Sequence, residues 1–310
     1  MAVAATSPRA VLAQESHRIG LLGAGAPMTP DAALLRHLAK AGHVVGKNLV
    51  IESRGAEGRL DRLPHLVGEL AAARVEAIVT SGYPAALAAK QATALPIVAN
   101  NSGDPVATGL VETLARPGGN LTGISDVSAE LTPKRLELLK LLVPGLRRVA
   151  ILWNADDLGM TLRSRASEAG ARALGVTVQQ LGVRQPDDFN DAFKAMDVDR
   201  PDAILMVADS LTILNRKRVF DYAALHRLPA IFEIDRLVRE GGLMSYGPDA
   251  DETAERMAAL IDRILKGRKP ADLPFEQPTR FKFAINLKTA RALGLAVPPS
   301  LLDRADETIE

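Results

Sequence analysis

Residues 96–125, PIVANNSGDPVATGLVETLARPGGNLTGIS, decide how the chain folds. Residues 96–99 predict a short buried strand, which breaks into a loop of small polar residues at 100–105. A short helical segment, a Pro-Gly-Gly-Asn turn at 117–120 and a second strand at 121–125 are expected to follow. Turn-forming residues therefore occur near both ends of a segment that connects two similar halves of the chain. This pattern indicates a crossing between two lobes.

The halves on either side of the crossing alternate buried strands with amphipathic helices. Before it, strands are expected at 17–23, 48–54 and 75–80, with helices from Pro30 (capped by Thr29), Arg59 and Pro84. After it, strands are expected at 148–153, 176–181, 202–208, 229–232 and 242–246, and helices at 133–143, 158–174, 186–197 and 212–226. This order predicts the α/β class, with two doubly wound parallel-sheet lobes and right-handed crossovers.

The remaining residues, 249–310, do not predict a third domain. Residues 249–266 carry a single apolar stripe, so this helix must dock on one of the lobes. Residues 267–278 hold three prolines and one glycine and are expected to be a linker that crosses between lobes. Residues 281–285 alternate apolar and polar side chains, which predicts an edge strand.

The composition narrows the class of protein. The chain has 310 residues with 38 Lys plus Arg against 37 Asp plus Glu, so it lacks the basic surplus that a nucleic-acid-binding protein shows. It contains no cysteine, which excludes disulfides, thiolate metal sites and cysteine nucleophiles. No apolar run approaches the roughly 18 residues that a membrane-spanning helix needs.

The first residues, MAVAATSPRAVLAQ, are rich in small side chains. Val11, Leu12 and Ala13 resemble a signal-peptidase site, with cleavage expected after Ala13. The basic and fully apolar regions of a complete signal are missing. Residues 1–16 are therefore interpreted as the remnant of a truncated secretion signal, with a disordered cytosolic N-terminus as the alternative.

Ligands of open parallel sheets bind beyond the carboxyl ends of the strands. The chain has seven Phe, three Tyr and one Trp, and four of these aromatics fall at expected strand ends. The predicted ligand-binding residues are Gly25, Ser81, Tyr83, Pro84, Asn101, Asp104, Ser125, Trp153, Asn154, Asp209, Ser210, Phe232, Glu233 and Tyr246. The alternative for each is an ordinary role in packing, turns or helix caps.

These side chains suit a small organic ligand with an apolar body. The four aromatics would supply flat apolar surface, and the helix that starts at Pro84 would direct free N–H groups at a ligand carboxylate. Serine and asparagine side chains would add neutral hydrogen bonds, and Asp104, Asp209 or Glu233 would hold an ammonium or hydroxyl group.

The usual signatures of an enzyme are missing. Gly23-Ala24-Gly25 follows the first strand, but Met28 stands where the dinucleotide fingerprint needs its third glycine. No phosphate-binding loop and no G-x-S-x-G elbow occur, and the five histidines are too scattered for a zinc site. The chain is therefore predicted to have no catalytic residues, no metal and no cofactor.

Several short motifs carry a resemblance to a known family. They are RGAEGR at 54–59, GDPV at 103–106, LARPGGN at 114–120, KRLELL at 134–139, GGLMSYGP at 241–248 and INLKTA at 285–290. With these motifs the chain resembles the substrate-binding proteins of ABC transporters that have the type I periplasmic binding fold. It is most similar to the branch related to tryptophan and tyrosine binders.

The resemblance implies two lobes joined by three crossover segments, near Ser125, near Gly247 and at 274–278. Lobe 1 would contain residues 17–124 and 248–276, and lobe 2 residues 125–247 and 277–310. The lobes would close by a hinge on a ligand in the cleft, an aromatic or otherwise apolar carboxylate or amino acid.

The resemblance also implies a cellular location and partners. The protein would be periplasmic, a monomer, and would deliver its ligand to an ABC permease and its ATPase, with no nucleic acid involved. A ligand-sensing subunit with the same fold and no role in transport is the first alternative. An enzyme on a doubly wound scaffold is the second.

Overall fold

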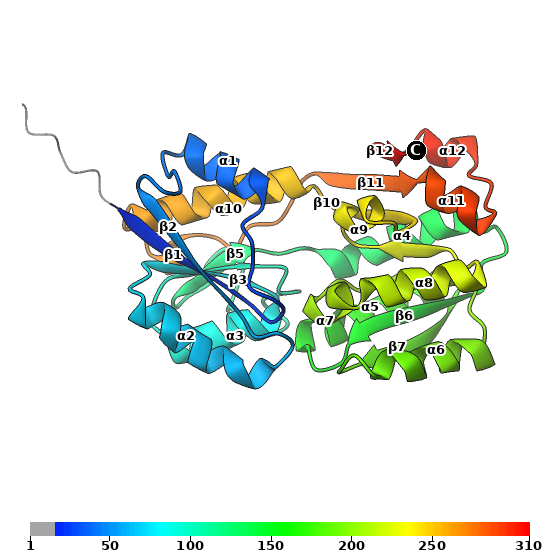
Figure 1. The fold of residues 1–310 in the computed structure, drawn as a ribbon, viewed down its shortest axis with the longest axis horizontal. Helices are drawn as coiled ribbons and strands as arrows, with labels where there is room; N and C mark the ends of the chain where they lie inside the picture. The colour runs from blue at the N-terminus through cyan, green and yellow to red at the C-terminus, as the bar shows by residue number, and fades with distance from the viewer. Residues whose placement is uncertain (1–15) are drawn as a thin grey trace, which may run out of the picture.

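The computed structural model describes residues 16–310, which form two α/β lobes (Figure 1). Lobe 1 is built on a five-stranded sheet in which every neighbouring pair is parallel, in the order β2-β1-β3-β4-β5. Its strands are β1 (His17–Gly23), β2 (Leu49–Gly55), β3 (Ala77–Ser81), β4 (Ile97–Asn100) and β5 (Leu121–Ile124). The carboxyl ends of all five strands therefore meet at one edge of the sheet.

Helices cover both faces of the lobe 1 sheet. They are α1 (Ala32–Lys40), the short η1 (Leu60–Arg62), α2 (Leu63–Ala72), α3 (Tyr83–Ala92) and α10 (Ala250–Leu265). Leu66 and Leu70 of α2 share a core with Ala86 of α3 on one face. On the other face Met257 and Ile261 of α10 pack into a second core, so α10 returns from far along the chain to complete this lobe.

Lobe 2 is built on a seven-stranded sheet in the order β12-β11-β10-β9-β8-β6-β7. Its strands are β6 (Arg148–Asn154), β7 (Thr177–Val183), β8 (Ala203–Met206), β9 (Ala230–Phe232), β10 (Met244–Pro248), β11 (Phe281–Asn286) and β12 (Glu307–Ile309). Neighbouring strands are parallel except β10 and β11, which run antiparallel. The sheet is therefore mixed, because the chain returns to lobe 2 from the opposite direction.

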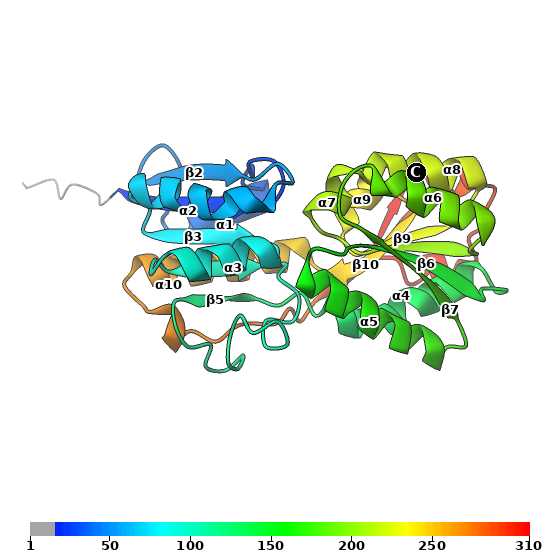
Figure 2. The ribbon, with the colours of Figure 1, turned by 90° about the horizontal axis from the view of Figure 1, so that it is seen from below.

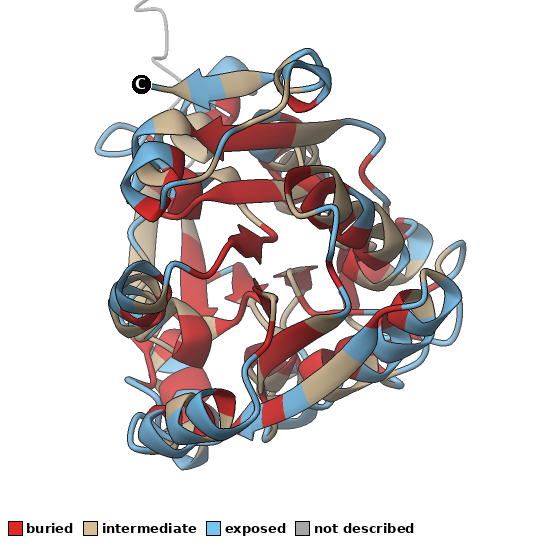
Figure 3. Ribbon diagram, turned by 90° about the vertical axis from the view of Figure 1, so that its right-hand side faces the viewer, coloured by how far each residue is buried: buried red, intermediate tan, exposed pale blue. Residues whose placement is uncertain are grey.

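Helices lie on both faces of the lobe 2 sheet and bury its inner strands (Figure 3). They are α4 (Ser128–Leu142), α5 (Leu158–Ala173), α6 (Asp188–Val198), α7 (Ser210–Leu214), α8 (Arg216–His226), α9 (Asp235–Arg239), α11 (Leu287–Leu293) and α12 (Pro299–Leu302). Helices α4 and α5 share one core with α11 and α12, while α6, α7, α8 and α9 contribute to the core on the other face.

The chain passes between the lobes three times, as predicted (Figure 2). The first crossing joins β5 to α4, the second joins β10 to α10, and the third leads from η2 (Pro270–Asp272) to β11. The crossings are hydrogen-bonded to one another: the Ser125 N–H donates to the Glu276 carbonyl at 2.9 Å, and the Asp249 N–H to the Arg280 carbonyl at 3.0 Å. The three segments therefore form one joint rather than three independent linkers.

Some predicted elements are wrong. The helical segment expected within 105–116 forms only turns. The helix expected from 133 begins at Ser128, with Pro133 inside it, and the helix expected over 212–226 is interrupted at Asn215 between α7 and α8. Asp31 rather than Thr29 caps α1, because its carboxylate accepts from the Ala33 and Leu34 N–H groups.

Two further differences concern lobe 2. The strand expected at the edge of the sheet, over residues 281–285, is β11. It lies inside the sheet because β12 pairs along its outer side. The sheet was expected to be parallel, and the β10–β11 pair is not. Residues 1–15, including the expected cleavage site after Ala13, lie outside the described part of the chain.

Candidate ligand-binding site

The two lobes approach each other closely across the cleft. The Asn101 side-chain amide of lobe 1 donates to the Ala208 carbonyl of lobe 2 at 3.5 Å. A Cβ placed on Gly25 would lie 3.5 Å from the Ser210 Cβ, and one on Gly103 would lie 3.1 Å from the Gly159 Cα. The backbones approach this closely because both partners at the last contact are glycines. The described structure therefore has its lobes in contact.

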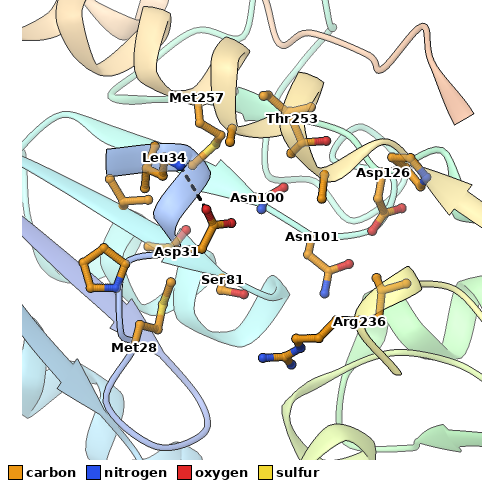
Figure 4. Close-up of a pocket in the computed structure, with 18 of the residues that line it drawn as sticks. Met28, Asp31, Leu34, Ser81, Asn100, Asn101, Asp126, Arg236, Thr253 and Met257 are labelled. Carbon is orange, nitrogen blue, oxygen red and sulfur yellow. Dashed lines mark hydrogen bonds between the residues drawn. The ribbon is translucent and has the colours of Figure 1, made fainter. Parts of the chain in front are cut away.

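A cavity of about 350 Å³ lies between the lobes, beside the crossings (Figure 4). This volume falls in the range of about 300–1,000 Å³ that is usual for small-molecule sites. The wall from lobe 1 is apolar, formed by side chains of the sheet, of α1, of α10 and of the loop after β1. Those side chains are Leu21, Met28, Leu34, Val79, Ile124, Ala254 and Met257.

Polar groups line another part of the cavity, and Ile213 and Ile234 of lobe 2 add to its apolar surface. Ser81 and Asn100 end β3 and β4, Asn101 follows them, and the first crossing contributes Ser125 and Asp126. Asn101 has a φ of 52°, a left-handed conformation that a non-glycine residue rarely adopts, and this turn carries its side chain to the interface between lobes. The arrangement combines an apolar pocket with a polar rim.

Lobe 2 supplies a buried network of charges beneath the cavity. Arg135 is fully buried and donates to Glu233 at 3.0 Å and to the Tyr246 carbonyl at 2.7 Å. Arg163 donates to the other Glu233 oxygen at 2.6 Å and also pairs with Asp126. Burial lowers the pKa of Arg135, whereas the two carboxylates outweigh burial and raise the pKa of Arg163. Two guanidinium groups thus balance two carboxylates next to the first crossing.

The structure brings some of the predicted site residues together at this cavity. Ser81, Asn101, Ser125 and Glu233 line it. Gly25 and Ser210 do not line it, but they face each other at the contact between lobes. Their placement follows the rule that led to their prediction, since each lies at or just beyond the carboxyl end of a strand.

The four aromatics are not among the lining residues, contrary to the expected aromatic cleft. Tyr83 and Phe232 are buried in the cores of lobes 1 and 2. The Trp153 indole packs beside Gly182, and its N–H donates to the Thr161 hydroxyl at 3.4 Å. The Tyr246 ring lies 6.2 Å from the ring of Phe281. These rings belong to the packing within each lobe, so nearness to a strand end did not decide where they point.

Two more predicted residues form a second polar group. The Asn154 amide donates to Asp209 at 2.6 Å, and Asp209 caps α7. Nearby, Asp157 caps α5 and is 2% exposed. Burial, together with the Asp209 carboxylate, raises the pKa of Asp157 to about 7. This group adjoins the contact of Gly159 with lobe 1 rather than the cavity.

The last two predicted residues have local roles. The exposed Asp104 accepts from the Val106 and Ala107 N–H groups at 2.9 and 3.0 Å and so caps a turn. Pro84 lies in the first turn of α3, as expected, but does not line the cavity.

Sequence reasoning missed several residues of the cavity. Asp31, Arg236, Thr253 and Met257 line it but were not predicted. Arg236 lies on α9, a five-residue helix that shows no clear period in the sequence. Met257 belongs to the apolar stripe of the helix expected at 249–266. The sequence predicts that this stripe docks on a lobe. The stripe is therefore the pattern that could have placed Met257 against a sheet.

The site holds no arrangement typical of metal binding. Within residues 16–310, no group of three or more His, Asp or Glu side chains is placed to hold a metal ion. None of the helices in that range is both long enough and apolar enough to cross a membrane. What the arrangement can do is enclose a small molecule between an apolar wall and a polar rim.

Two lobes with a ligand-sized cavity between them and three crossings define the type I periplasmic binding fold. The chain belongs to the ABC transporter substrate binding protein family, whose model matches residues 32–309. Members of this family bind small ligands outside the cytoplasmic membrane and work with an ABC permease and its ATPase; they are not enzymes.

Comparisons with individual proteins agree. The chain is 25% identical over 262 residues to a tyrosine-binding protein of Clostridioides difficile, covering 84% of this chain and 75% of that one. It is similar to the solved ABC domain of Streptococcus pneumonia in complex with L-Trp, with 25% identity and a TM-score of 0.85 over 95% of this chain and 100% of that one. A conserved domain protein of Vibrio cholerae, with 23% identity and the same coverage, shares the fold with a TM-score of 0.86.

Proposed function

We propose that this protein captures an aromatic or otherwise apolar amino acid or carboxylate by closing its two lobes around it. The observation that carries the proposal is the cavity between the lobes, whose lobe 1 wall is apolar and whose rim is polar. An apolar wall binds the side chain of such a ligand by removing it from water. The few polar groups at the rim orient its charged end.

The relatives support the aromatic part of the proposal. One is named for tyrosine, and another was solved with L-Trp. The cavity itself offers Met28 and Met257, whose thioether groups make favourable contacts with aromatic rings. In this proposal the ring of the ligand packs between these methionines, rather than against the four aromatics of the chain.

The role that we propose is delivery of this ligand to a permease in the periplasm by a monomeric protein. The division into lobes at 124/125, 247/248 and 276/277 is part of the same proposal, because the hinge would lie at those positions. A ligand-sensing subunit with no role in transport is the alternative. Uptake of the ligand by cells, lost on deletion of this gene alone, would distinguish transport from sensing.

Thermal unfolding with a panel of ligands tests the ligand class. We expect aromatic amino acids to raise the melting temperature, because a ligand that binds only the native state stabilises it by RT ln(1 + [L]/Kd). Met257→Ala should reduce the rise by removing a thioether contact from the apolar wall. Met196→Ala, which removes the same side chain from the core of lobe 2, is the matched control and should keep the rise. A rise with sugars alone would contradict the proposal.

A further inference from the structure

The charges around the cavity can be sorted into balanced and unbalanced groups. On the lobe 2 side, Asp126 and Glu233 are balanced by Arg135 and Arg163. These four side chains neutralise one another and leave no charge for a ligand.

Asp235, which also lines the cavity, belongs to a second balanced group. Its carboxylate lies 2.6 Å from Arg239 and 3.5 Å from Lys282, and both of these cations also pair with Glu307, at 2.7 and 2.6 Å. Two carboxylates and two cations again cancel. Neither Asp235 nor its partners can therefore be the group that holds a ligand charge.

Arg236 is the positive charge that remains. Its only ion-pair partner among the described residues is Glu240, at 3.8 Å, and Glu240 is also paired with Arg216. One carboxylate between two guanidinium groups leaves a surplus positive charge. In Figure 4 the Arg236 side chain reaches from lobe 2 toward Ser81 and Met28 of lobe 1.

Asp31 is the negative charge that remains, and it lies on lobe 1. One carboxylate oxygen accepts from the Ala33 and Leu34 N–H groups at 2.6 and 2.9 Å, which caps α1. Within residues 16–310 no Lys, Arg or His forms an ion pair with it, since the basic side chains Arg36 and His37 of α1 pair with Asp251 instead. The second oxygen therefore has neither a cation nor a hydrogen-bond donor from this part of the chain.

From this charge pattern we infer that the cavity is built for a zwitterion, an α-amino acid whose carboxylate is held by Arg236 and whose ammonium group is held by Asp31. The inference rests on the proposed function and names the two residues that select the ligand. A guanidinium group binds a carboxylate through two parallel hydrogen bonds, and a carboxylate accepts from an ammonium group. Because the two charges belong to different lobes, only a ligand with both groups joins them.

The test compares an amino acid with analogues that lack one charge. Isothermal titration would use L-tryptophan, tryptamine without the carboxylate, and indole-3-propionate without the ammonium group. Wild-type protein should bind L-tryptophan about tenfold to a hundredfold more tightly than either analogue, the effect of one hydrogen-bonded charge. If L-tryptophan is not bound, the amino acid with the largest thermal shift and its own two analogues take its place.

Two variants assign the charges to residues. Arg236→Gln should bind L-tryptophan about tenfold to a hundredfold more weakly than wild type does, and should bind tryptamine with unchanged affinity. Asp31→Asn should weaken binding of L-tryptophan by the same factor and should bind indole-3-propionate with unchanged affinity. The variant keeps α1 intact because asparagine is an equally good cap. Arg165→Gln and Asp61→Asn, both exposed and without ion pairs in the described structure, are the matched controls and should bind as wild type.

The possible failures are distinguishable. If wild-type protein binds no amino acid, the proposed ligand class is wrong and this inference falls with it. If an amino acid binds but both variants retain full affinity, or the one-charge analogues bind as tightly, only the head-group assignment is overturned.

Discussion

At the scale of single residues, Asp157 combines burial with a charge that is costly to keep. It is 2% exposed, lies beside Gly159 at the contact between lobes, and has Asp209, Arg163 and Tyr83 within electrostatic reach. Burial, together with the Asp209 carboxylate, raises its pKa from an ordinary value of 3.8 to about 7. The folded protein therefore holds a proton here that the unfolded chain releases.

This raised pKa predicts how Asp157→Asn behaves with pH. Between about pH 4 and pH 7 the folded state binds more protons than the unfolded state, so stability falls as the pH rises and the penalty is complete above pH 7. The variant keeps the cap of α5 without the charge. It should be more stable than wild type by about 1–3 kcal/mol at pH 8 and no more stable at pH 4. Urea denaturation at both pH values measures this.

Asp156→Asn is the control for that experiment. Asp156 is exposed, adjacent to Asp157, and paired with Arg184 at 3.1 Å. It should leave stability nearly unchanged at both pH values. Equal effects of the two substitutions would show that the penalty is not specific to Asp157.

At the scale of elements, Glu252 fastens the start of α10 to the third crossing. It is 4% exposed and accepts from the Thr279 hydroxyl at 2.5 Å, the Arg280 N–H at 2.6 Å and Arg256 at 2.8 Å. Burial alone would raise the pKa of Glu252, but these hydrogen bonds outweigh it and lower the pKa to about 2. This ionised carboxylate therefore adds to the Asp249–Arg280 backbone hydrogen bond in holding the second and third crossings together.

Glu252→Gln should loosen this joint. Three donors, on the partly exposed Arg256 and the exposed Thr279 and Arg280, would exchange a charged acceptor for a neutral one, and we expect a loss of about 1–3 kcal/mol at pH 7. Because the folded pKa is lowered, the contribution of Glu252 is complete above about pH 4.5 and disappears as the pH falls toward 2. The difference between wild type and variant should shrink over that range in chemical denaturation.

Glu255→Gln provides the comparison, since Glu255 lies one turn along α10 with a side chain that is 62% exposed. Its removal should cost far less than 1 kcal/mol, as for an ordinary surface pair. A similar cost for both variants would contradict the fastening role of Glu252.

The elements also show what the sequence could and could not predict. The strand β1 matches its predicted bounds, residues 17–23, because a continuous apolar run lies between a polar start and a glycine. The start of α4 was missed because Val127, with a φ of 44°, precedes it and makes no side-chain cap. The N-cap position itself carries no cap signal, because Val127 stands there, and Pro133 resembled the first residue of a helix. The three-residue strand β12 is too short and polar to have a period.

At the scale of the whole molecule, contact between the lobes depends on Gly159 having no side chain. A Cβ there would lie 3.0 Å from the Ser102 carbonyl oxygen and 3.4 Å from the Tyr83 Cβ, both in lobe 1. Gly159→Val should therefore act as a wedge. We expect a larger radius of gyration in solution scattering and a weaker affinity for the amino-acid ligand, with little change in the stability of either lobe.

Gly68→Val on α2 is the matched substitution, because a Cβ at Gly68 would meet nothing within 4 Å. It should change neither the radius of gyration nor the affinity. If Gly159→Val binds ligand and scatters as wild type does, closure does not need this contact.

The cavity illustrates the limit of prediction at this scale. Ser81, Asn101, Ser125 and Glu233 were predicted from their place at or beyond strand ends, a rule that needs only the order of elements. The rest of the wall needs the path of the chain, because Met257 reaches lobe 1 only after two crossings. The direction of each aromatic ring depends on the strands and helices packed beside it, which no strand-end rule describes.

The long detour of the chain before α10 has a consequence for biosynthesis. Met257, Leu260, Ile261 and Ile264 cover one face of a sheet whose strands end at residue 124. A ribosome must therefore translate the lobe 2 elements from α4 to β10 before lobe 1 can bury that face. Until then the nascent polypeptide exposes an apolar, aggregation-prone sheet surface. Chains released before α10 is made should therefore be substrates for chaperones or proteases.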